Sequence, residues 1–550
     1  MPVKFFKTLP RPSVNPWLFN IIVALLITVV QNVVYFRKIL QLVDVSTSHN
    51  LLFVASMPVT LLVGLNLIFS LILLPYIRKP IVIFLFTIDA FAQYFMQAYG
   101  VLIDRDMIQN ALDTTTAETL ALVTPQLGWY LIISALLPSL LILWIKVKPA
   151  NLTWQNAGYH VLNILVSLLM IVLIATFFYK DYASLMRNNQ QLIKNLVPIN
   201  MFTGSYSYYK HNYKTKRVFT PLGLDAHENT SAHDDGKKNL IILVVGETTR
   251  AQNFALGGYN KPTTPRLAAD NVIYFPQTTS CGTATAVSVP CMFSNMPRSH
   301  YDGDIAVSED NVLDLLQRAN VDVLWRENDG GCKGVCSRVP TEELSEWHLP
   351  ALCSSGVCLD EALLRNLDSY IDARTHDTVI VLHTMGSHGP TYYQRYPKSL
   401  ATFSPTCDSN EIQNCSNQSL VNTYDNTIVY IDYMLDKTIK MLQAHSDKFN
   451  TALVYLSDHG ESLGENGLYL HGMPYPVAPV QQTHIPMVMW LSPDYIKAHG
   501  VSEDCIKARA GRLPYSQDNL FSTLLGLFNV DTKLYQPELD IVHPCRNPQQ

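Results

Sequence analysis

The chain has 550 residues, a hydrophobic content of 48% and a formal net charge of −5 at pH 7. A single soluble domain is excluded, because long apolar stretches gather in the first third of the chain and apolar runs shorten to strand length past residue 240. The net charge shows no basic excess, so we expect no nucleic-acid partner.

Five apolar stretches in the first third are long enough to cross a hydrocarbon core of about 30 Å. They cover residues 17–36, 51–76, 80–98, 123–145 and 159–179. The first stretch is too long for the apolar part of a signal peptide and lacks an A-x-A-like cleavage site, so we interpret it as a membrane anchor. Residues 1–180 are therefore expected to form a transmembrane domain of five helices.

Charges between these stretches predict the orientation of the helices. The segments on one side contain cations without acids, namely Lys4, Lys7, Arg11, Arg78, Lys79, Lys146 and Lys148. Because lysine and arginine are enriched in cytoplasmic loops, this side and the N-terminus are expected to face the cytoplasm. Five crossings then place the C-terminal two-thirds of the chain on the opposite side.

All 10 cysteines lie in the part of the chain that is expected to be exported. An even number of cysteines in an oxidising compartment predicts disulfides. Proximity in sequence, with the last pair left by elimination, predicts Cys281–Cys291, Cys332–Cys336, Cys353–Cys358, Cys407–Cys415 and Cys505–Cys545. A zinc site built on Cys332 and Cys336 is the alternative, and the other close pairs disfavour it.

Residues 181–238 mix polar side chains with aromatic and cationic ones, most densely in YSYYKHNYKTKRVF at 206–219. This segment is either an ordinary linker or a bridging segment that lies along an anionic membrane leaflet. On a leaflet, the tyrosines would lie at headgroup depth and the cations near phosphates. These residues are Tyr206, Tyr208, Tyr209, Lys210, Tyr213, Lys214, Lys216 and Arg217.

Residues 239–550 alternate apolar runs of strand length with helix-compatible stretches, which is typical of an α/β domain. Four runs end in charged or imidazole groups: NLIILVV before Glu247, VDVLW before Arg326-Glu327-Asn328, TVIVL before His383 to His388, and TALVYL before Ser457-Asp458-His459. Ligands bind at the carboxyl ends of strands in open α/β sheets. We therefore expect a zinc or manganese cluster at this edge. Its ligands would come from Glu247, His388, Asp458 and His459.

The stretch SCGTATAVSVPCMFS at 280–294 offers hydroxyl groups between Cys281 and Cys291. A disulfide between these cysteines would hold a short helix N-terminus, whose free N–H groups suit a phosphate. The alternative is that the threonines and serines are only caps and turns. Composition does not choose among Thr283, Thr285 and Ser288.

Characteristic motifs extend over nearly the whole chain: YGVLIDRDMIQNALDTTTAET, VVGETTRAQNFALGGY, TSCGTATAVSVPCMFS, NDGGCKGVC, HTMGSHGPTYY, NTYDNT and LSDHGESLGENGLYLHGMPY. With these motifs the sequence resembles the lipid A phosphoethanolamine transferases of Gram-negative inner membranes. That family is related to the mobile colistin-resistance enzymes and belongs to the alkaline phosphatase/sulfatase superfamily. The resemblance implies a five-helix transmembrane domain followed by a periplasmic alkaline phosphatase/sulfatase-like α/β domain with disulfides.

The resemblance also implies roles for single residues. The positions that match the family's catalytic zinc ligands are Glu247, Thr285, Asp458 and His459. Thr285 matches the nucleophile as well. His388 and His471 match catalytic histidines that are assigned to the substrate phosphate or to a second zinc ion.

Further positions match residues that bind the substrate in the family. Besides the two histidines they are Asn110, Thr114, Glu118 and Lys333. Glu118 would pair with the ammonium of the ethanolamine, although a solvated helix acid is the alternative. Some relatives carry a serine three residues before the lysine, where this chain has Gly330, so a hydroxyl contact is lost there.

The implied reaction is a ping-pong transfer. Thr285 attacks phosphatidylethanolamine, diacylglycerol leaves, and the phosphoethanolamine-threonine intermediate passes its group to a lipid A phosphate. Zinc at the hydroxyl oxygen would lower its pKa, so that threonine attacks near neutral pH. The added ammonium would weaken the binding of polymyxin and other cationic peptides. The resemblance thus implies a monomeric, zinc-dependent enzyme of the bacterial inner membrane with its catalytic domain in the periplasm.

Three alternatives belong to other classes. A phosphoethanolamine or phosphoglycerol transferase that acts on LPS core heptose or a periplasmic glucan would use the same catalytic residues. A sulfatase would ordinarily show a C/S-x-P-x-R motif, which this sequence lacks. A non-enzymatic membrane scaffold would leave the strand-end residues unexplained.

Overall fold

The computed structural model describes residues 10–72, 75–149, 154–210, 218–229, 236–344, 347, 349–354 and 357–546. The chain forms two compact units: Met1–Ile108 with Val123–Tyr208, and Gln109–Leu122 with Tyr209–Gln550. Several residues named above lie outside the described ranges, namely Lys4 and Lys7 near the N-terminus and Tyr213, Lys214, Lys216 and Arg217 in the predicted bridging segment.

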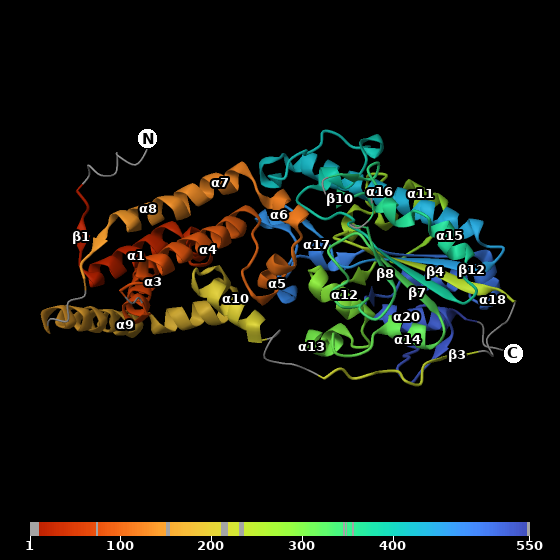
Figure 1. The fold of residues 1–550 in the computed structure, drawn as a ribbon, viewed down its shortest axis with the longest axis horizontal. Coiled ribbons are helices and arrows are strands. Elements are labelled where there is room, and N and C mark those ends of the chain that lie inside the picture. Colours follow the sequence, from red (N-terminus) through yellow and green to blue (C-terminus); the bar gives the residue numbers. More distant parts are fainter. Residues whose placement is uncertain are drawn as a thin grey trace. The chain divides into compact units, whose positions relative to one another are not determined.

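The first unit is helical and contains the predicted spans (Figure 1). Within the described residues, four helical segments are long and apolar enough to cross a membrane: α3 (Ser48–Ile72), α4 (Arg78–Ala98), Pro125–Trp144, and Gly158–Met186 of α9 (Trp154–Asn188). The predicted span 17–36 is divided into α1 (Pro16–Val30) and α2 (Val33–Leu42), which are bent by 57°. A fifth span exists if this bent pair crosses as one.

The break between α1 and α2 is held by buried amide groups. Gln31 Nε2 donates to the carbonyl groups of Phe86 at 2.9 Å and Ser134 at 3.0 Å. Ser134 lies in the π-helical turn η2 (Ile132–Leu136). Asn32 Nδ2 donates to two further carbonyl groups. The bond from Asn32 to the Ile27 carbonyl gives the end of α1 an internal partner of the kind that a polar group needs in hydrocarbon, and the bonds from Gln31 connect the break to α4 and η2.

The remaining elements of this unit are short. The π-helical turn separates α7 (Pro125–Leu131) from α8 (Leu137–Trp144). Strands β1 (Ser13–Val14) and β2 (Lys146–Val147) pair in parallel. The unit ends with η3 (Gln190–Asn195) and α10 (Ile199–Tyr209), so Tyr206, Tyr208 and Tyr209 of the predicted bridging segment are helical.

The second unit is an α/β domain built on a seven-stranded sheet with the order β5-β16-β12-β4-β11-β7-β8. Its strands are β4 (Lys238–Gly246), β5 (Ile273–Tyr274), β7 (Asp322–Glu327), β8 (Thr341–Glu343), β11 (Thr378–His383), β12 (Phe449–Ser457) and β16 (Met487–Leu491). The strands from β12 to β8 run parallel, and β16 and β5 are antiparallel to their neighbours. The central strands are buried on both faces, which explains their continuous apolar runs.

Helices cover both faces of this sheet (Figure 1). On one face lie α12 (Thr285–Phe293), α14 (Val312–Arg318) and α20 (Asn519–Leu527), which join the core of Ile241, Leu243 and Val245. On the other face lie α11 (Pro265–Ala269), α15 (Leu367–Asp372) and α16 (Asn417–Ala444). The other helices of this unit are α6 (Thr116–Leu122), α13 (Gly303–Ala306), α17 (Val480–Thr483), α18 (Pro493–Ala498) and α19 (Glu503–Ala510). Helix α5 (Arg105–Asp113) is divided between the two units after Ile108.

The register of the parallel strands brings their carboxyl ends together. Gly246 of β4 is paired with Ser457 of β12, and His383 of β11 is paired with the last residue of β7. Glu247 and Asp458, which follow the paired residues of β4 and β12, therefore lie at the same edge of the sheet. The expected strand-end cluster is thus located at the edge where open α/β sheets bind ligands.

The cysteines form the five predicted disulfides: Cys281–Cys291, Cys332–Cys336, Cys353–Cys358, Cys407–Cys415 and Cys505–Cys545. No described cysteine is free, so the alternative zinc site on Cys332 and Cys336 is wrong. The first disulfide closes the loop that contains Thr285.

Candidate active site

Three side chains meet at the carboxyl edge of the sheet with polar atoms that lack a protein partner. His459 Nε2 lies 3.5 Å from Glu247 Oε1 and 3.2 Å from Asp458 Oδ2. The three side chains are fully buried, and these three atoms make no hydrogen bond to the part of the chain that is described. An unpaired buried polar atom costs about 1–3 kcal/mol. Three of them facing one another therefore indicate a binding position for a cation.

The opposite atoms of the same side chains are held in place. Asp458 Oδ1 accepts from the backbone N–H of Thr248 at 3.1 Å and of His459 at 2.6 Å. His459 Nδ1 lies 3.0 Å from the Gly460 carbonyl oxygen, so Nδ1 carries the hydrogen and Nε2 is left with its lone pair. These contacts direct Asp458 Oδ2 and His459 Nε2 toward the same position.

Burial also sets the charges of this cluster. It lowers the pKa of His459 to about 4, so the ring is neutral at pH 7, the form that binds metals. Burial, together with the carboxylates of Asp458 and Asp329, raises the pKa of Glu247 well above its ordinary value. Two carboxylates and an imidazole suit zinc or manganese, so these residues fit the metal that the sequence predicts.

Hydrogen bonds distinguish the hydroxyl groups that composition left open. Thr283 Oγ1 donates to the Met473 carbonyl at 2.6 Å, and Ser288 Oγ accepts from the Gly282 N–H at 2.9 Å. Thr285 instead starts α12 and donates to Glu247 Oε2 at 3.1 Å. Of these three hydroxyl groups, the one on Thr285 is hydrogen-bonded to the cluster of Glu247, Asp458 and His459.

Two glycines allow the backbone to pack closely around the cluster. A Cβ atom on Gly386, whose φ is +50°, would lie 2.5 Å from the Glu247 carbonyl oxygen. A Cβ atom on Gly460 would lie 2.0 Å from the Gln481 carbonyl oxygen. Gly386 of MGSHG and Gly460 of SDHGES are therefore required, because any larger residue would collide with the backbone packed around Glu247 and His459.

Gln517 connects the nucleophile loop to the strand end and was missed by sequence reasoning. Its Nε2 donates to the carbonyl groups of Ser457 at 2.8 Å and Asp458 at 2.6 Å. Its Oε1 accepts from the Cys281 N–H at 2.6 Å. Gln517 lies in no motif, and its partners are distant in sequence, so no local signal predicted this role.

His471 and His388 extend the cluster. The His471 ring lies 4.5 Å from the His459 ring and 5.4 Å from the His388 ring, centroid to centroid. Burial alone would lower the pKa of His471, but Glu461, 2.8 Å from Nδ1, raises it above the ordinary value. Burial lowers the pKa of His388 to about 3. At pH 7 His388 is therefore neutral, whereas His471 is the better holder of a proton.

Glu118 is brought next to His388. Its Oε1 lies 3.6 Å from His388 Nε2. Its Oε2 accepts from the N–H of Thr115 at 2.7 Å and from the Thr115 hydroxyl at 3.0 Å. Although burial opposes ionisation, the neighbouring His388, the two bonds from Thr115 and the Arg395 guanidinium hold the pKa of Glu118 below its ordinary value. The described structure thus places a carboxylate from residues 109–122 at the edge of the cluster.

The other predicted substrate-binding residues make local contacts. Thr114 Oγ1 donates to the Asn110 carbonyl at 2.6 Å, which joins these two residues to each other. Lys333 Nζ donates to the Gly330 carbonyl at 2.9 Å. Burial raises the pKa of Asp329, a carboxylate near Glu247, and the positive charge of Lys333 partly counteracts this rise.

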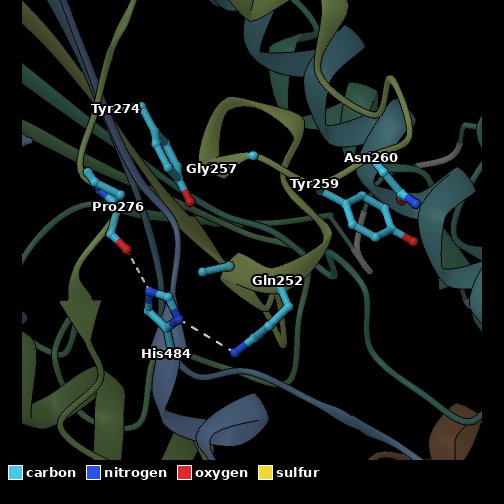
Figure 2. Close-up of a pocket in the computed structure, with 9 residues that line it drawn as sticks. Gln252, Gly257, Tyr259, Asn260, Tyr274, Pro276 and His484 are labelled. Atoms are coloured by element: carbon cyan, nitrogen blue, oxygen red, sulfur yellow. Dashed lines mark hydrogen bonds between the residues drawn. The ribbon is translucent and has the colours of Figure 1, made fainter.

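A separate pocket of about 530 Å³ lies on the same unit. In Figure 2, His484 Nε2 faces the Pro276 carbonyl at 2.7 Å and its Nδ1 faces Gln252 Nε2 at 3.5 Å. The pocket is lined by Ala251, Gln252, Gly257, Gly258, Tyr259, Asn260, Tyr274, Pro276 and His484. None of the site residues predicted from the sequence belongs to this lining, so the strand-end cluster is the candidate active site.

The fold and the cluster define an α/β domain of the sulfatase type. Residues 239–530 match the family model described as "Sulfatase", and residues 61–213 match the model described as "Phosphoethanolamine transferase EptA/EptB". The chain is 51% identical over 540 residues to "Phosphoethanolamine transferase EptA" of Escherichia coli K12, covering 98% of this chain and 99% of that protein. It is 37% identical over 535 residues to "Phosphatidylethanolamine transferase Mcr-1" of Escherichia coli, covering 94% and 96%.

A solved structure resembles the chain over its length. It is the integral membrane protein lipooligosaccharide phosphoethanolamine transferase A (EptA) from Neisseria meningitidis, with a TM-score of 0.93 and 40% identity, covering 98% of this chain and 100% of that one. The chain belongs to the phosphoethanolamine transferase family. The resemblance inferred from the motifs and the predicted fold class are thereby confirmed.

Proposed function

We propose that this chain transfers phosphoethanolamine from phosphatidylethanolamine to a phosphate group of lipid A, with Thr285 as the nucleophile. The observation that carries the proposal is the 3.1 Å hydrogen bond from the Thr285 hydroxyl to Glu247, beside unpaired atoms of Asp458 and His459. The names of relatives support the two substrates: one is a phosphatidylethanolamine transferase, and another acts on lipooligosaccharide.

Glu247, Thr285, Asp458 and His459 would hold a zinc ion, and a bound zinc ion supplies Lewis acidity that lowers the pKa of the Thr285 hydroxyl. In the first half-reaction the Thr285 oxygen bonds to phosphorus, and the bond from phosphorus to the diacylglycerol oxygen breaks. Glu247 Oε2 accepts the Thr285 proton, and His471, whose pKa is raised by Glu461, donates a proton to the leaving diacylglycerol oxygen.

In the second half-reaction a lipid A phosphate oxygen attacks the phosphothreonine and gives its proton to His471, which restores the acid spent in the first half-reaction. The bond from phosphorus to Thr285 breaks, and the proton on Glu247 returns to the Thr285 oxygen. His388, neutral at pH 7, serves as a hydrogen-bonding partner of the phosphate. Glu118 stays ionised beside it and would bind the primary ammonium of the ethanolamine through a charge-assisted hydrogen bond. Lys333, with Asn110 and Thr114, is proposed to complete the substrate site.

Both substrates are membrane lipids, which agrees with the apolar spans. We propose that residues 1–180 lie in the bacterial inner membrane, that 181–238 bridge along its surface, and that 239–550 work in the periplasm as part of a monomer. Five disulfides support an oxidising compartment. Tethering the site to the membrane raises its effective concentration at lipid headgroups.

The test is mass spectrometry of lipid A, and of tryptic peptides of the protein, from cells that express the wild type or Thr285→Ala. The wild type should add phosphoethanolamine to lipid A and carry it transiently on Thr285. The variant should lose both signals, because its rate of phosphoethanolamine transfer should fall by about 10³-fold or more. Ser288→Ala, on the same helix, is the matched control and should stay active.

Three outcomes contradict parts of the proposal. Near-normal lipid A modification by Thr285→Ala would remove Thr285 as the nucleophile. An adduct on another residue would reassign it. Phosphoethanolamine found on core heptose or on a periplasmic glucan, and not on lipid A, would change the acceptor while leaving the chemistry at Thr285 intact.

A further inference from the structure

A second group of buried, unpaired atoms lies next to Glu247. One ligand atom each from Glu247, Asp329 and His383 lies within 4.8 Å of the other two. The His383 side chain is fully buried and that of Asp329 is 5% exposed. Among the described residues, His383 Nε2 and Asp329 Oδ1 have no hydrogen-bond partner. No role was predicted for either residue from the sequence.

The His383 ring is held from its other side by Glu327. His383 Nδ1 lies 2.8 Å and 3.0 Å from the two carboxylate oxygens of Glu327, and the indole N–H of Trp325 donates to the same carboxylate at 2.9 Å. A hydrogen is thereby fixed on Nδ1, and Nε2 is the nitrogen that faces Asp329. A carboxylate on the far nitrogen is the usual support of a metal-binding histidine.

A purely structural ion pair explains only half of this arrangement. It accounts for the contact of His383 Nδ1 with Glu327. It leaves a buried N–H on Nε2 without a partner, because Asp329 Oδ2 is 3.9 Å away and beyond hydrogen-bond range. It also leaves Asp329 Oδ1 unpaired. A cation between these atoms would satisfy both.

We propose that Asp329 and His383, together with Glu247, form a second position for a divalent cation, adjacent to the Glu247–Asp458–His459 site. Two carboxylates and one imidazole suit Zn²⁺ or Mn²⁺. Glu247 belongs to both groups of ligand atoms and its Oε1 makes no hydrogen bond, so its carboxylate can be shared, as in paired sites with metals about 3.5–4 Å apart. This position differs from the one that the family resemblance gives to His388 and His471.

Metal counting on the purified full-length protein tests the proposal. Protein stripped with a chelator is titrated with Zn²⁺, and separately with Mn²⁺, by calorimetry, and bound metal is measured by mass spectrometry after desalting. Asp329→Asn and His383→Gln should each bind one ion fewer per chain than the wild type. Glu247→Gln should weaken both positions.

Matched controls lie at the opposite ends of the same strands. Asp322→Asn at the start of β7 and His376→Gln just before β11 should keep the wild-type stoichiometry. Equal stoichiometry in the wild type, Asp329→Asn and His383→Gln would overturn the proposal. None of these readouts depends on turnover, so a failure of the proposed transfer reaction would leave them unchanged.

A second measurement needs no variant and therefore does not depend on the folding of one: crystals of the wild type are soaked in Zn²⁺. Anomalous diffraction at the zinc edge should show a peak about 2.0–2.1 Å from His383 Nε2, beside Asp329, in addition to the peak at His459. A peak at His459 with none at His383 under saturating Zn²⁺ would overturn the second position.

Discussion

The two units of the molecule differ in how the buried polar groups described above are arranged. In the helical unit, the amides of Gln31 and Asn32 donate to backbone carbonyl groups at a helix break. In the α/β unit, Glu247, Asp458 and His459 are equally buried, and each has a polar atom that lacks a protein partner and faces the other two side chains. The first arrangement stabilises a backbone, and the second leaves capacity to bind a ligand.

The apolar side chains are also distributed differently. In the helical unit, the most apolar window of Gly158–Met186 is only 6% buried, so its leucines and valines face outward. In the α/β unit, the strand residues Ile241, Leu243 and Val245 are fully buried under helices. This contrast is the one expected when the surrounding solvent is hydrocarbon for one unit and water for the other.

The largest effect should follow from removing a charge at the unpaired cluster. Asp458→Asn keeps the size of the side chain but removes a charged metal ligand, so bound metal should be lost and transfer should fall by about 10³-fold or more. Metal analysis and lipid A mass spectrometry measure the two effects. Asp377→Asn, also buried but at the opposite edge of the sheet, should keep its metal. Full metal content in an inactive Asp458→Asn protein would remove this residue from the metal site.

A smaller effect is expected where the α/β unit includes residues 109–122. Glu118→Gln preserves shape and removes one charge-assisted contact to an ammonium, worth about 1.5–3 kcal/mol, so transfer from phosphatidylethanolamine should fall about 10- to 100-fold. The measurements are the rate of adduct formation on Thr285 and the extent of lipid A modification. Asp113→Asn, an exposed acid nearby, is the control. Unchanged rates in both assays would make this segment a connector only.

The helical unit should respond in stability and not in chemistry. Gln31→Leu leaves the carbonyl groups of Phe86 and Ser134 without this donor, which should lower the free energy of unfolding by about 1–2 kcal/mol. Thermal unfolding of the full-length protein in detergent measures this. Thr176→Val, which removes an exposed hydroxyl from the same unit, should have a smaller effect. A wild-type melting temperature for Gln31→Leu would mean that the break is held by other contacts.

The smallest effect concerns a carboxylate of the α/β unit away from the site. Burial and the charges of Asp436 and Asp432 raise the pKa of Asp270 to about 6 from an ordinary value of 3.8. The folded state therefore binds this proton more tightly than the unfolded chain, and stability falls as the pH rises between these values. Asp270→Asn should melt about 1–3 °C higher than the wild type above pH 6.

The difference between Asp270→Asn and the wild type should shrink as the pH falls through 6 and disappear below about pH 4, where Asp270 is protonated in both states. Melting curves across this pH range measure it. The exposed Asp368→Asn is the control. A gain that is constant with pH would show that the side chain acts by packing and not by its charge.

Several features of this protein were predictable from the sequence because they depend on near neighbours. Apolar runs predicted the membrane spans and the central strands, since burial or lipid contact requires continuous apolar residues. Cysteines close in sequence predicted the disulfides. Polar residues directly after four strands predicted the cluster with Glu247, Asp458 and His459, because parallel strands end at a common edge.

Other features were decided only by the tertiary structure, because their partners are far away in the chain. The apolar run 17–36 does not show its break, which depends on the carbonyl groups of Phe86 and Ser134. Thr285 is distinguished from Thr283 by its hydrogen-bond partner: the Thr285 hydroxyl donates to Glu247, whereas the Thr283 hydroxyl donates to the Met473 carbonyl. Both partners are distant in sequence. His383 was visible as a strand-end residue and Asp329 as part of the motif NDGGCKGVC, but their unpaired atoms are identified only once Glu327 is seen to occupy the other side of the His383 ring.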